Sequence, residues 1–436
     1  PISDADCIKA PFHKPLKDSE ETIYLNARRE KLGGYLPSRT NEAPPLKIPD
    51  IDIFEELILG SDSRKVSTTM VFVRLLTIIT KDERISKNIV PIIPDEARTF
   101  GIDPLFRELG IYSHVGQKYD PVDSEQFLFY KEATDGQILE EGISEAGSIS
   151  SFIAAGTSYS NYNINLIPFF IYYSMFGFQR VGDFIWAAAD MRTRGFLIGG
   201  TAGKTTLAGE GLQHQDGHSH LMASAVPNIR AYDPAFSYEI ATIIHHGLKE
   251  MYEWQNDIIY YLTLENENYS HPPMKNNYKE GIIKGIYQIK PHTSKDKKLS
   301  VQLLASGPMV NEAMEASQLL MKDWGIDASV WSVTSYSELH KEAEDVRRWN
   351  ILHPTSEPRK SFLEKKIKKE NGPVIAISDY VKLVAEQILP YIKCPFVALG
   401  TDGFGRSDTR ENLRSFFEVN KYFIILYALD KLYVED

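Results

Sequence analysis

Cysteine is nearly absent from this sequence, since Cys7 and Cys394 are the only two among 436 residues. Two cysteines cannot build a disulfide framework, which excludes the class of small secreted proteins held together by disulfides. The same scarcity is typical of a protein from a reducing compartment, so we expect a cytoplasmic location.

Long hydrophobic runs and an excess of positive charge are lacking as well. The longest apolar run, Leu166–Phe178, is too short to span a bilayer and contains Pro168. Asp and Glu number 59 against 48 Lys and Arg, which gives a net charge of −11. A membrane and a nucleic acid are therefore not expected as main partners.

The residues that are present have the composition of a globular protein with a large core. Hydrophobic residues make up 43% and charged residues 25% of the chain, whose length is typical of two or three domains. Residues 1–48 are rich in Pro, Lys and polar side chains and are predicted to be a linker or the tail of a preceding domain. The chain begins Pro-Ile-Ser without methionine, which is typical of a fragment or a processed chain.

Beyond residue 48, short apolar runs alternate with segments of helical periodicity. The runs that we predict to be strands are 89–93, 166–172, 196–198, 258–264, 301–304, 329–333, 374–377 and 396–400. Strands that alternate with helices at this spacing indicate parallel α/β sheets. We expect two α/β domains, at 49–274 and 275–436.

Three helix starts are predicted from their cap residues. Ser67 or Thr68 precedes one apolar stripe and Ser144 precedes another. At 233–234, an Asp followed by Pro predicts a helix that runs to about Tyr252. The helix after Ser144 is expected to bury Ala146, Ile149, Phe152 and Ile153.

The stretch 195–220 stands out because glycines follow an apolar run and precede His214, Asp216, His218 and His220. Glycines of this density let a backbone approach a ligand closely. We therefore interpret the stretch as part of a site, and expect it to order over that site when ligands are present.

Three other interpretations of this stretch stay open. A phosphate-binding loop would need a glycine at position 198, which is Ile. A metal site could use His214 and His218, although Gly217 lies between them and helical periodicity is missing. The third interpretation is a solvated surface loop.

Acidic residues mark two further positions. Asp95 and Glu96 follow a predicted strand, where α/β sheets place their ligands, but they could equally begin a helix. Glu145 lies in the first turn of a predicted helix, where interaction with the helix dipole is a sufficient explanation from local sequence alone.

Six segments together resemble the homodimeric type of pyruvate dehydrogenase first component, a family that uses thiamine diphosphate. The segments are 93–101 (IPDEARTFG), 137–147 (QILEEGISEAG), 168–180 (PFFIYYSMFGFQR), 194–220 (RGFLIGGTAGKTTLAGEGLQHQDGHSH), 263–269 (TLENENY) and 400–414 (GTDGFGRSDTRENLR). They follow the family's order over nearly the whole chain. The resemblance implies a transketolase-like α/β fold, with a pyrimidine-binding domain and a carboxyl-terminal domain on this chain.

The family's diphosphate-binding signature, Gly-Asp-Gly followed by Asn, is missing from the sequence. The resemblance therefore implies that a diphosphate domain outside this chain supplies the Mg²⁺ ligands, and that this chain has none. In this family the cofactor lies between the diphosphate domain of one subunit and the pyrimidine domain of a second, so we expect a homodimer.

The resemblance implies roles for individual residues. Glu145 would hydrogen-bond the 1′ nitrogen of the cofactor's aminopyrimidine and relay a proton, with Phe176 stacked on that ring and Ile143 packed under it. Tyr173 and His214 would contact the substrate. Asp95 and Glu96 also resemble polar groups around the thiazolium ring and substrate, whereas Asp216, His218 and His220 could merely hold the loop.

The activity implied is oxidative decarboxylation of pyruvate, with transfer of the acetyl group to a lipoyl domain of the dihydrolipoyl acetyltransferase component. Alternatives are transketolase or another 2-oxo acid decarboxylase of the same fold, and a non-catalytic half that needs a partner chain. A metal hydrolase built on the histidine stretch is a further alternative.

Overall fold

The computed structural model describes residues 3–9, 14–31, 34, 40–94, 97, 100–102, 104–120, 130–209, 211–293, 299–368 and 371–433. Contacts divide the chain into two compact units. One unit comprises residues 1–44 with 158–164, and the other comprises residues 45–157 with 165–436. Across the described ranges, no helix combines the length and apolarity needed to cross a membrane.

The smaller unit contains helices that the sequence analysis did not predict. They are α1 (Asp4–Cys7), α2 (Glu20–Lys31) and α7 (Ser158–Tyr162). Helix α2 buries no residue, but its first turn is acidic and its last turn basic, an arrangement that interacts favourably with the helix dipole. Local charge therefore stabilises a helix where apolar periodicity did not predict one.

The larger unit contains a six-stranded parallel sheet with the strand order β5-β2-β6-β7-β9-β8. Its strands are β2 (Ile89–Ile93), β5 (Leu139–Glu140), β6 (Ile167–Tyr173), β7 (Gly195–Gly200), β8 (Ile229–Tyr232) and β9 (Ile259–Thr263). The helices that pack on this sheet include α4 (Thr68–Ile79), α6 (Glu145–Gly156), α8 (Phe178–Asp190), α9 (Ser219–Ser224) and α10 (Ser237–Leu248).

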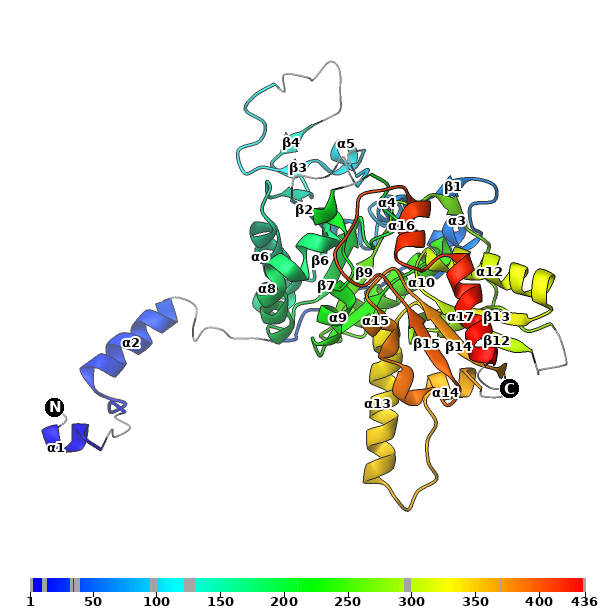
Figure 1. Ribbon diagram of the computed structural model, residues 1–436. Coiled ribbons are helices and arrows are strands. Elements are labelled where there is room, and N and C mark those ends of the chain that lie inside the picture. The colour runs from blue at the N-terminus through cyan, green and yellow to red at the C-terminus, as the bar shows by residue number, and fades with distance from the viewer. Residues whose placement is uncertain are drawn as a thin grey trace. The chain divides into compact units, whose positions relative to one another are not determined.

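Alternation along β6 explains why this sheet is covered on both faces. Phe169 and Ile171 belong to the hydrophobic cluster that contains residues of α4 and α10. Phe170 and Tyr172 belong to the cluster formed with α6 and α8, which lie side by side (Figure 1). Because successive strand residues point to opposite faces, an apolar run such as 167–173 requires a helix layer on each side.

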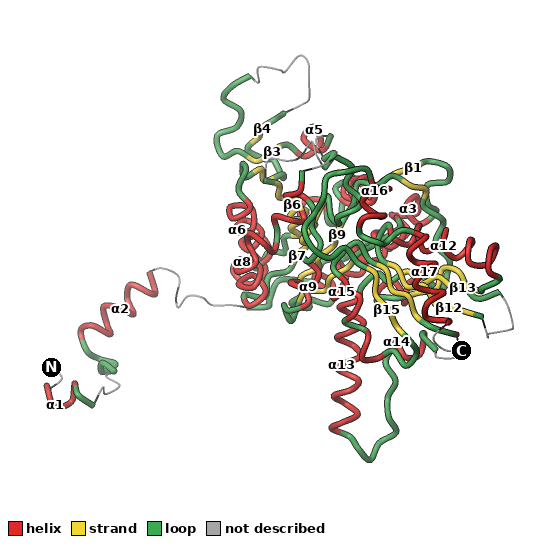
Figure 2. Tube along the Cα trace, viewed as in Figure 1, coloured by secondary structure: helices red, strands yellow, loops and turns green. Residues whose placement is uncertain are grey.

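A second sheet has five strands in the order β11-β13-β12-β14-β15, of which β11 alone is antiparallel to its neighbour. The strands are β11 (Tyr287–Lys290), β12 (Ser300–Ala305), β13 (Asp327–Ser332), β14 (Val374–Ile377) and β15 (Phe396–Leu399). Its helices are α12 (Met309–Trp324), α13 (Tyr336–Leu352), α14 (Phe362–Lys366), α15 (Lys382–Glu386), α16 (Arg410–Phe416) and α17 (Lys421–Tyr433). Helices flank the strands of this unit throughout (Figure 2).

One hydrophobic cluster runs through both sheets, since it contains Ile243 of α10 as well as Leu303 of β12 and Val330 of β13. This continuity explains why the two sheets form a single compact unit by contacts. The division into domains at 49–274 and 275–436 stays a prediction.

Shorter elements complete the described structure. They are η1 (Ile51–Phe54), α3 (Glu55–Ile58), β1 (Lys65–Val66), η2 (Ser86–Asn88), α5 (Leu105–Leu109), β3 (Ile111–Tyr112), β4 (Glu132–Ala133), η3 (Ser174–Phe176), η4 (Leu212–His214), η5 (Lys249–Glu253), β10 (Tyr269–Ser270), α11 (Lys279–Lys284) and η7 (Leu389–Tyr391). Strand β1 pairs with β10 and β3 pairs with β4.

The predicted helix starts were right in two cases and wrong in one. The Ser67 hydroxyl accepts a hydrogen bond from the Met70 N–H, and Ser144 caps α6. Helix α10 begins at Ser237, because the carboxylate of Asp233 is used elsewhere and caps no helix. In α6, Ile149 and Phe152 are buried as predicted and Ile153 is half-buried, whereas Ala146 is exposed.

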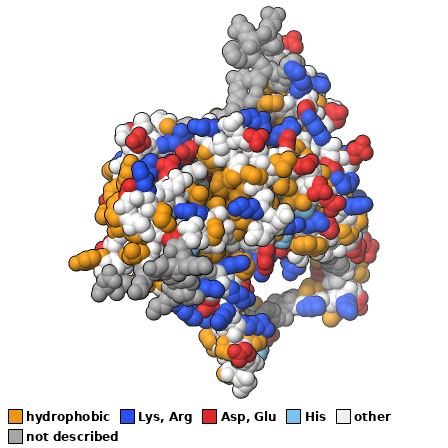
Figure 3. Space-filling model, turned by 90° about the vertical axis from the view of Figure 1, so that its right-hand side faces the viewer, with side chains coloured by type: hydrophobic (Ala, Val, Ile, Leu, Met, Phe, Trp, Pro, Cys, Tyr) orange, Lys and Arg blue, Asp and Glu red, His pale blue; other side chains and the backbone are white. Residues whose placement is uncertain are grey.

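Hydrophobic side chains also gather at the centre of one face of this unit, around α12, with charges of both signs near them (Figure 3). Met321 and Trp324 at the end of α12 are 37% and 47% exposed. Helix α12 therefore presents apolar side chains to solvent as well as to the sheet.

Candidate active site

The strand order of the first sheet determines which loops converge. The chain passes from β2 to β5 on one side and returns to β6 on the other, so the order reverses between β2 and β6. Ligands of open α/β sheets bind at such a reversal, outside the carboxyl ends of the strands. Glu145 follows β5, Phe176 follows β6 and His214 follows β7, so all three leave the same edge of the sheet.

Glu145 and Phe176 hold one guanidinium group between them. The Arg180 Nη1 donates to Glu145 Oε1 at 3.2 Å and to Oε2 at 3.1 Å. The Arg180 Cζ also lies 3.8 Å from the centre of the Phe176 ring. The Glu145 side chain is only 13% exposed, whereas that of Arg180 is 51% exposed. The predicted cofactor contacts are therefore adjacent, and an unpredicted arginine connects them.

Tyr173, Phe176 and His214 form an aromatic cluster beside this pair. The His214 ring stacks on Tyr173, with 4.6 Å between centroids and 4° between planes. Phe176 meets both rings edge-on, at 5.7 Å from Tyr173 and 5.6 Å from His214. All three are half-buried, so their faces and edges remain partly accessible to a ligand. The structure thus brings together four of the predicted site residues.

The first half of the glycine-rich stretch is buried against the second sheet. The carboxylate of Asp379 accepts hydrogen bonds from the N–H groups of Lys204 and Thr205. The Lys204 Nζ donates at 2.5 Å to the carbonyls of Thr401 and Gly403. Burial raises the pKa of the Asp379 carboxyl to about 6 and lowers that of the Lys204 amine.

These contacts decide between the interpretations of the stretch. Lys204 is directed into the protein, which excludes the phosphate-loop interpretation. Thr201, Thr205 and Thr206 are fully buried, which excludes a solvated loop for this half. The expectation that ligands order the stretch stays a prediction. Thr201 has φ +55°, an unfavourable value for a β-branched residue that tertiary contacts must hold.

Hydrogen bonds to Asp216 stabilise the second half of the stretch. Its carboxylate accepts from the hydroxyls of Ser174 and Ser219, and from the N–H groups of His218 (3.0 Å) and Ser219 (3.1 Å). Asp216 is fully buried. The bond from Ser174 ties the loop that bears His214 to the turn that bears Phe176. Asp216 therefore positions the site from within the protein.

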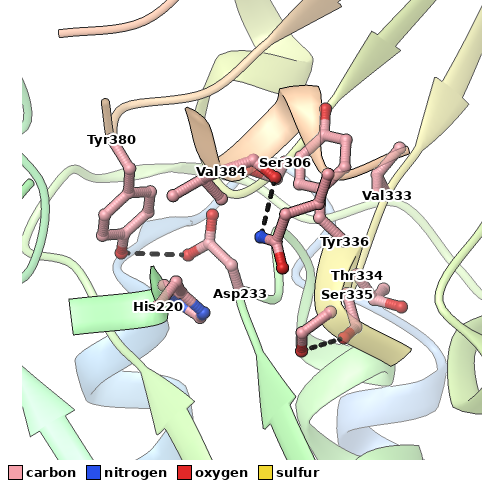
Figure 4. Close-up of a pocket in the computed structure, with 11 residues that line it drawn as sticks. His220, Asp233, Ser306, Val333, Thr334, Ser335, Tyr336, Tyr380 and Val384 are labelled. Atoms are coloured by element: carbon pink, nitrogen blue, oxygen red, sulfur yellow. Dashed lines mark hydrogen bonds between the residues drawn. The ribbon is translucent and has the colours of Figure 1, made fainter. Parts of the chain in front are cut away.

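His218 and His220 have hydrogen-bond partners outside the aromatic cluster of His214. The His218 Nε2 lies 3.0 Å from the amide nitrogen of Gln179. His220 is buried and lines a small cavity between the two sheets (Figure 4). Its Nε2 lies 2.9 Å from the Thr263 hydroxyl. Burial lowers the pKa of His220. Both histidines thus have structural contacts of the kind expected for residues that merely hold the loop.

The same cavity contains Asp233, which the sequence analysis had assigned to a helix cap. Its Oδ1 accepts a hydrogen bond from Thr263 at 2.8 Å and another from Tyr380 at 3.3 Å (Figure 4). Burial raises the pKa of Asp233. Asp233 therefore joins the two sheets.

Three predicted site residues are not brought into this cluster by the described contacts. Ile143 is 80% exposed, so packing under a pyrimidine ring stays a prediction for it. Asp95 and Glu96 lie outside the described residues. Among the residues that are described, no group of three or more His, Cys, Asp and Glu side chains is arranged to hold a metal ion.

Sequence reasoning missed Arg180 and Ser174. Both lie inside a segment that carried the family resemblance, yet neither was assigned a role. Arg180 follows Phe176 by only four residues, across the non-helical Gly177, so the two side chains are close along the chain. That spacing could have indicated the contact between Arg180 and Phe176. Nothing in the sequence indicated the hydrogen bond from Ser174 to Asp216, which are 42 residues apart.

Two family models match the chain. The pyruvate dehydrogenase E1 component middle domain matches residues 46–272, and the transketolase-like C-terminal domain matches residues 285–420. A curated relative, the pyruvate dehydrogenase E1 component of Pseudomonas aeruginosa, is 53% identical over 99% of this chain and 49% of its own length. The chain thus spans about half the length of the curated relatives it matches.

Solved structures show the fold. Transketolase from Leishmania mexicana superposes with a TM-score of 0.64 at 17% identity, covering 88% of this chain and 48% of that one. An inactive tetramer of a split-gene transketolase gives a TM-score of 0.56 at 15% identity, covering 85% of this chain and 99% of that one. With a transketolase-like α/β fold and a middle-domain model that matches more than half of its residues, the chain belongs to the pyruvate dehydrogenase E1 component family.

Proposed function

We propose that the protein containing this chain is a thiamine-diphosphate-dependent pyruvate dehydrogenase. It decarboxylates pyruvate oxidatively and transfers the acetyl group to a lipoyl domain of an acetyltransferase component. Family membership and about 50% identity to relatives named pyruvate dehydrogenase E1 component support this activity. A cytoplasmic location belongs to the same proposal.

The arrangement of Glu145 and Phe176 fits the aminopyrimidine part of the cofactor. A carboxylate beside an accessible aromatic face already holds a planar, nitrogen-bearing group in this structure, namely the guanidinium of Arg180. An aminopyrimidine is also planar and presents ring nitrogens at its edge. When bound, the cofactor would supply the electron sink that decarboxylation of a 2-oxo acid requires.

The residues of this chain then have separate tasks. Glu145 exchanges a proton with the ring nitrogen at its carboxylate, and Phe176 orients the ring by stacking. Tyr173 and His214 contact the Phe176 ring, and they can hydrogen-bond the substrate or the incoming lipoyl group. Asp216 keeps the loop of His214 close to these groups.

The diphosphate and its Mg²⁺ need a site elsewhere. The described residues hold no group suited to a metal, and the chain covers about half of its curated relatives. The split-gene transketolase, whose chain is matched along 99% of its length, is described as inactive in its homotetramer. We propose that a diphosphate-binding half, on this polypeptide or on a partner, completes the site in a dimer.

The observation that carries the proposal is the pairing of Glu145 and Phe176 around one planar group. Calorimetry with thiamine diphosphate and Mg²⁺ tests it, on this chain alone and on the assembly with the diphosphate-binding half. We expect tight binding by the assembly only. Micromolar, Mg²⁺-dependent binding by the chain alone would contradict the divided site.

Activity assays on the assembly separate this function from those of its relatives. Pyruvate should be decarboxylated in preference to 2-oxoglutarate, and a ketose phosphate should not be cleaved. Preference for either of the other substrates would replace the proposed activity with a different one of the same fold. Absence of all three activities would favour a non-catalytic half.

A further inference from the structure

Hydrogen bonds join four fully buried side chains into a closed ring, the hydrogen-bond ring of Ser174, Asp216, Ser219 and Tyr261. The hydroxyls of Ser174 and Ser219 both donate to one oxygen of Asp216, its Oδ2. The Tyr261 hydroxyl donates to the Ser219 Oγ at 2.8 Å and lies 3.1 Å from the Ser174 Oγ. Tyr261 therefore closes a ring that would otherwise be open between the two serines.

Burial explains why the two serines need a third hydroxyl. Each serine has one hydroxyl proton and donates it to Asp216, so the lone pairs of its oxygen are left to accept from another group. A buried polar atom without a partner destabilises the folded state. The Tyr261 hydroxyl lies within hydrogen-bond distance of both serine oxygens, and a phenylalanine at this position would serve neither.

The hydrogen-bond ring connects the segments that bear two of the candidate site residues. Ser174 begins η3, the turn that ends with Phe176. Asp216 follows His214 by two residues. Tyr261 lies in the middle of β9, which pairs with β7 on one side and with β8 on the other. A strand inside the sheet thus holds the His214 loop and the Phe176 turn together, and rigid elements of this kind position a site more precisely than loops do.

Gly199 of β7 leaves space for the hydrogen-bond ring. A Cβ atom at position 199 would lie 2.9 Å from the Ser174 Oγ and 3.0 Å from the Tyr261 hydroxyl oxygen. These distances are too short for a carbon atom, so any larger residue would push the two hydroxyls aside. Glycine inside a strand is typical of such close approaches.

We propose that Tyr261 is a positioning residue of the active site. Its hydroxyl fixes Asp216 through the two serines, and so keeps the loop of His214 correctly spaced from Phe176. The inference rests on the proposed function, in which Phe176 contacts the cofactor and His214 contacts the substrate or the lipoyl group. Displacing a catalytic group by about 1 Å can slow a reaction about 10²-fold. Loss of the Tyr261 hydroxyl should therefore reduce turnover more than it reduces binding.

A neighbouring tyrosine of β9 provides a matched control. Tyr261→Phe removes the hydroxyl but keeps the aromatic ring, which meets Phe178 edge-on at 5.2 Å. Tyr260 is also fully buried, but it belongs to the hydrophobic cluster on the opposite face of the sheet. Its hydroxyl donates to Glu250 and lies 2.8 Å from the His246 Nδ1. Tyr260→Phe therefore removes an equally buried hydroxyl from the same strand and leaves the hydrogen-bond ring intact.

Hydrogen exchange measures how firmly Asp216 is held. The N–H groups of His218 and Ser219 donate to the Asp216 Oδ1 at 3.0 and 3.1 Å, so their exchange rates depend on its position. In the full assembly without cofactor, both amides should exchange about tenfold faster in Tyr261→Phe than in the wild type. In Tyr260→Phe their exchange should stay within about twofold of the wild-type rate.

Steady-state kinetics on the loaded assembly separate positioning from binding. For acetylation of a lipoyl domain, kcat should fall about tenfold in Tyr261→Phe, because His214 and Phe176 are less well placed. The KM for pyruvate and the Kd for thiamine diphosphate should stay within about threefold, because the groups that bind these ligands are unchanged. Tyr260→Phe should keep its kcat within about twofold of the wild type.

A second variant disturbs the hydrogen-bond ring without removing a hydroxyl. Gly199→Ala should also lower kcat about tenfold, since its methyl group displaces the hydroxyls of Ser174 and Tyr261. Combined with Tyr261→Phe, it should cost little beyond the larger single loss, because both changes act on one network. Losses that multiply to about 10²-fold would show independent effects and would contradict the role of the hydrogen-bond ring.

Two further results would overturn the role of Tyr261. One is an unchanged kcat in Tyr261→Phe, whatever the exchange rates are. The other is an equal loss of kcat in Tyr260→Phe, because the effect would then follow from reduced stability of the strand. If the wild-type assembly neither binds thiamine diphosphate nor decarboxylates pyruvate, the proposed function fails. The exchange experiment then still decides whether Tyr261 holds Asp216.

Discussion

The two α/β halves of the larger unit are built alike but differ in what they offer a ligand. In the first half, the chain segments that follow β5, β6 and β7 bring Glu145, Phe176 and His214 together at one edge of the sheet. In the second half, polar groups near the strand ends turn inward: Asp379 accepts from the backbone of the glycine-rich stretch, and the carbonyl of Thr401 accepts from Lys204. The first half therefore gathers the candidate site residues, and the second holds in place the loop that bears one of them.

The comparison also shows how the site loop is held. Lys204 and Thr205 are fastened to the second half, whereas Asp216 is fastened to Ser174 in the first. The stretch between these anchors bears His214, which is half-buried and stacked on Tyr173. Preorganised loops of this kind reduce the cost of ordering a site when ligands bind.

The largest effect is expected at Glu145, the proposed proton relay of the first half. Replacing Glu145 with Gln should slow exchange of the thiazolium proton by about 10²–10⁴-fold, because a proton relay at the carboxylate is lost. Exchange is followed by NMR on the loaded assembly. Glu56→Gln, which breaks a comparable surface pair with Arg74, should leave the rate unchanged. An unaltered rate in Glu145→Gln would show that the first half is not the catalytic one.

In the second half, Asp379 should make the free energy of unfolding depend on pH. Burial raises the pKa of Asp379 from 3.8 to about 6, so its protonated form is favoured in the folded state. Its contribution to stability is therefore complete below about pH 4 and is lost as the pH rises through 6. Relative to Asp379→Asn, the wild type should lose about 3 kcal/mol of unfolding free energy across this range.

Urea unfolding between pH 4 and pH 7 measures this loss. The exposed Asp402, in the same half, gives Asp402→Asn as a control for losing one carboxylate. A wild type that instead gains stability over Asp379→Asn with rising pH would show that the bonds from Lys204 and Thr205 outweigh burial.

His214 lies on the loop that is anchored to both halves. Its replacement should affect one step of the reaction more than another. His214→Ala should reduce reductive acetylation of a lipoyl domain by about 10²-fold, while pyruvate decarboxylation with an artificial electron acceptor falls by less than about tenfold. Both assays use the full assembly. Equal losses would mean that the histidine acts before acetyl transfer, and no loss in either would make it a structural member of its loop.

The smallest effect is expected at Ile143, the exposed residue at the rim of the first half. Because Ile143 is 80% exposed, Ile143→Ala should change the unfolding free energy by no more than about 0.5 kcal/mol. If it packs under the cofactor ring, the same change should weaken thiamine diphosphate binding by about threefold to tenfold. Unchanged affinity would remove Ile143 from the site.

Much of the fold was predictable because the signals are local. The apolar runs of β2 and β14 coincide with their strands, Ile89–Ile93 and Val374–Ile377. The hydroxyls of Ser67 and Ser144 satisfy the first N–H groups of their own helices. Strand β8, helix α13 and helix α17 were not predicted. The helix expected at Asp233 begins at Ser237 instead, because the Asp233 carboxylate accepts hydrogen bonds from the distant Thr263 and Tyr380.

By itself the sequence determined the parallel α/β class, the absence of a diphosphate-binding signature, and the identity of Glu145, Phe176, Tyr173 and His214 as site candidates. Only the tertiary structure decided which groups meet them. The arginine that covers Phe176 is 35 residues from its carboxylate partner, and the aspartate that anchors Lys204 is 175 residues away. Contacts across such distances depend on how strands are ordered in a sheet and how sheets share a core, and neither leaves a periodic trace in the chain.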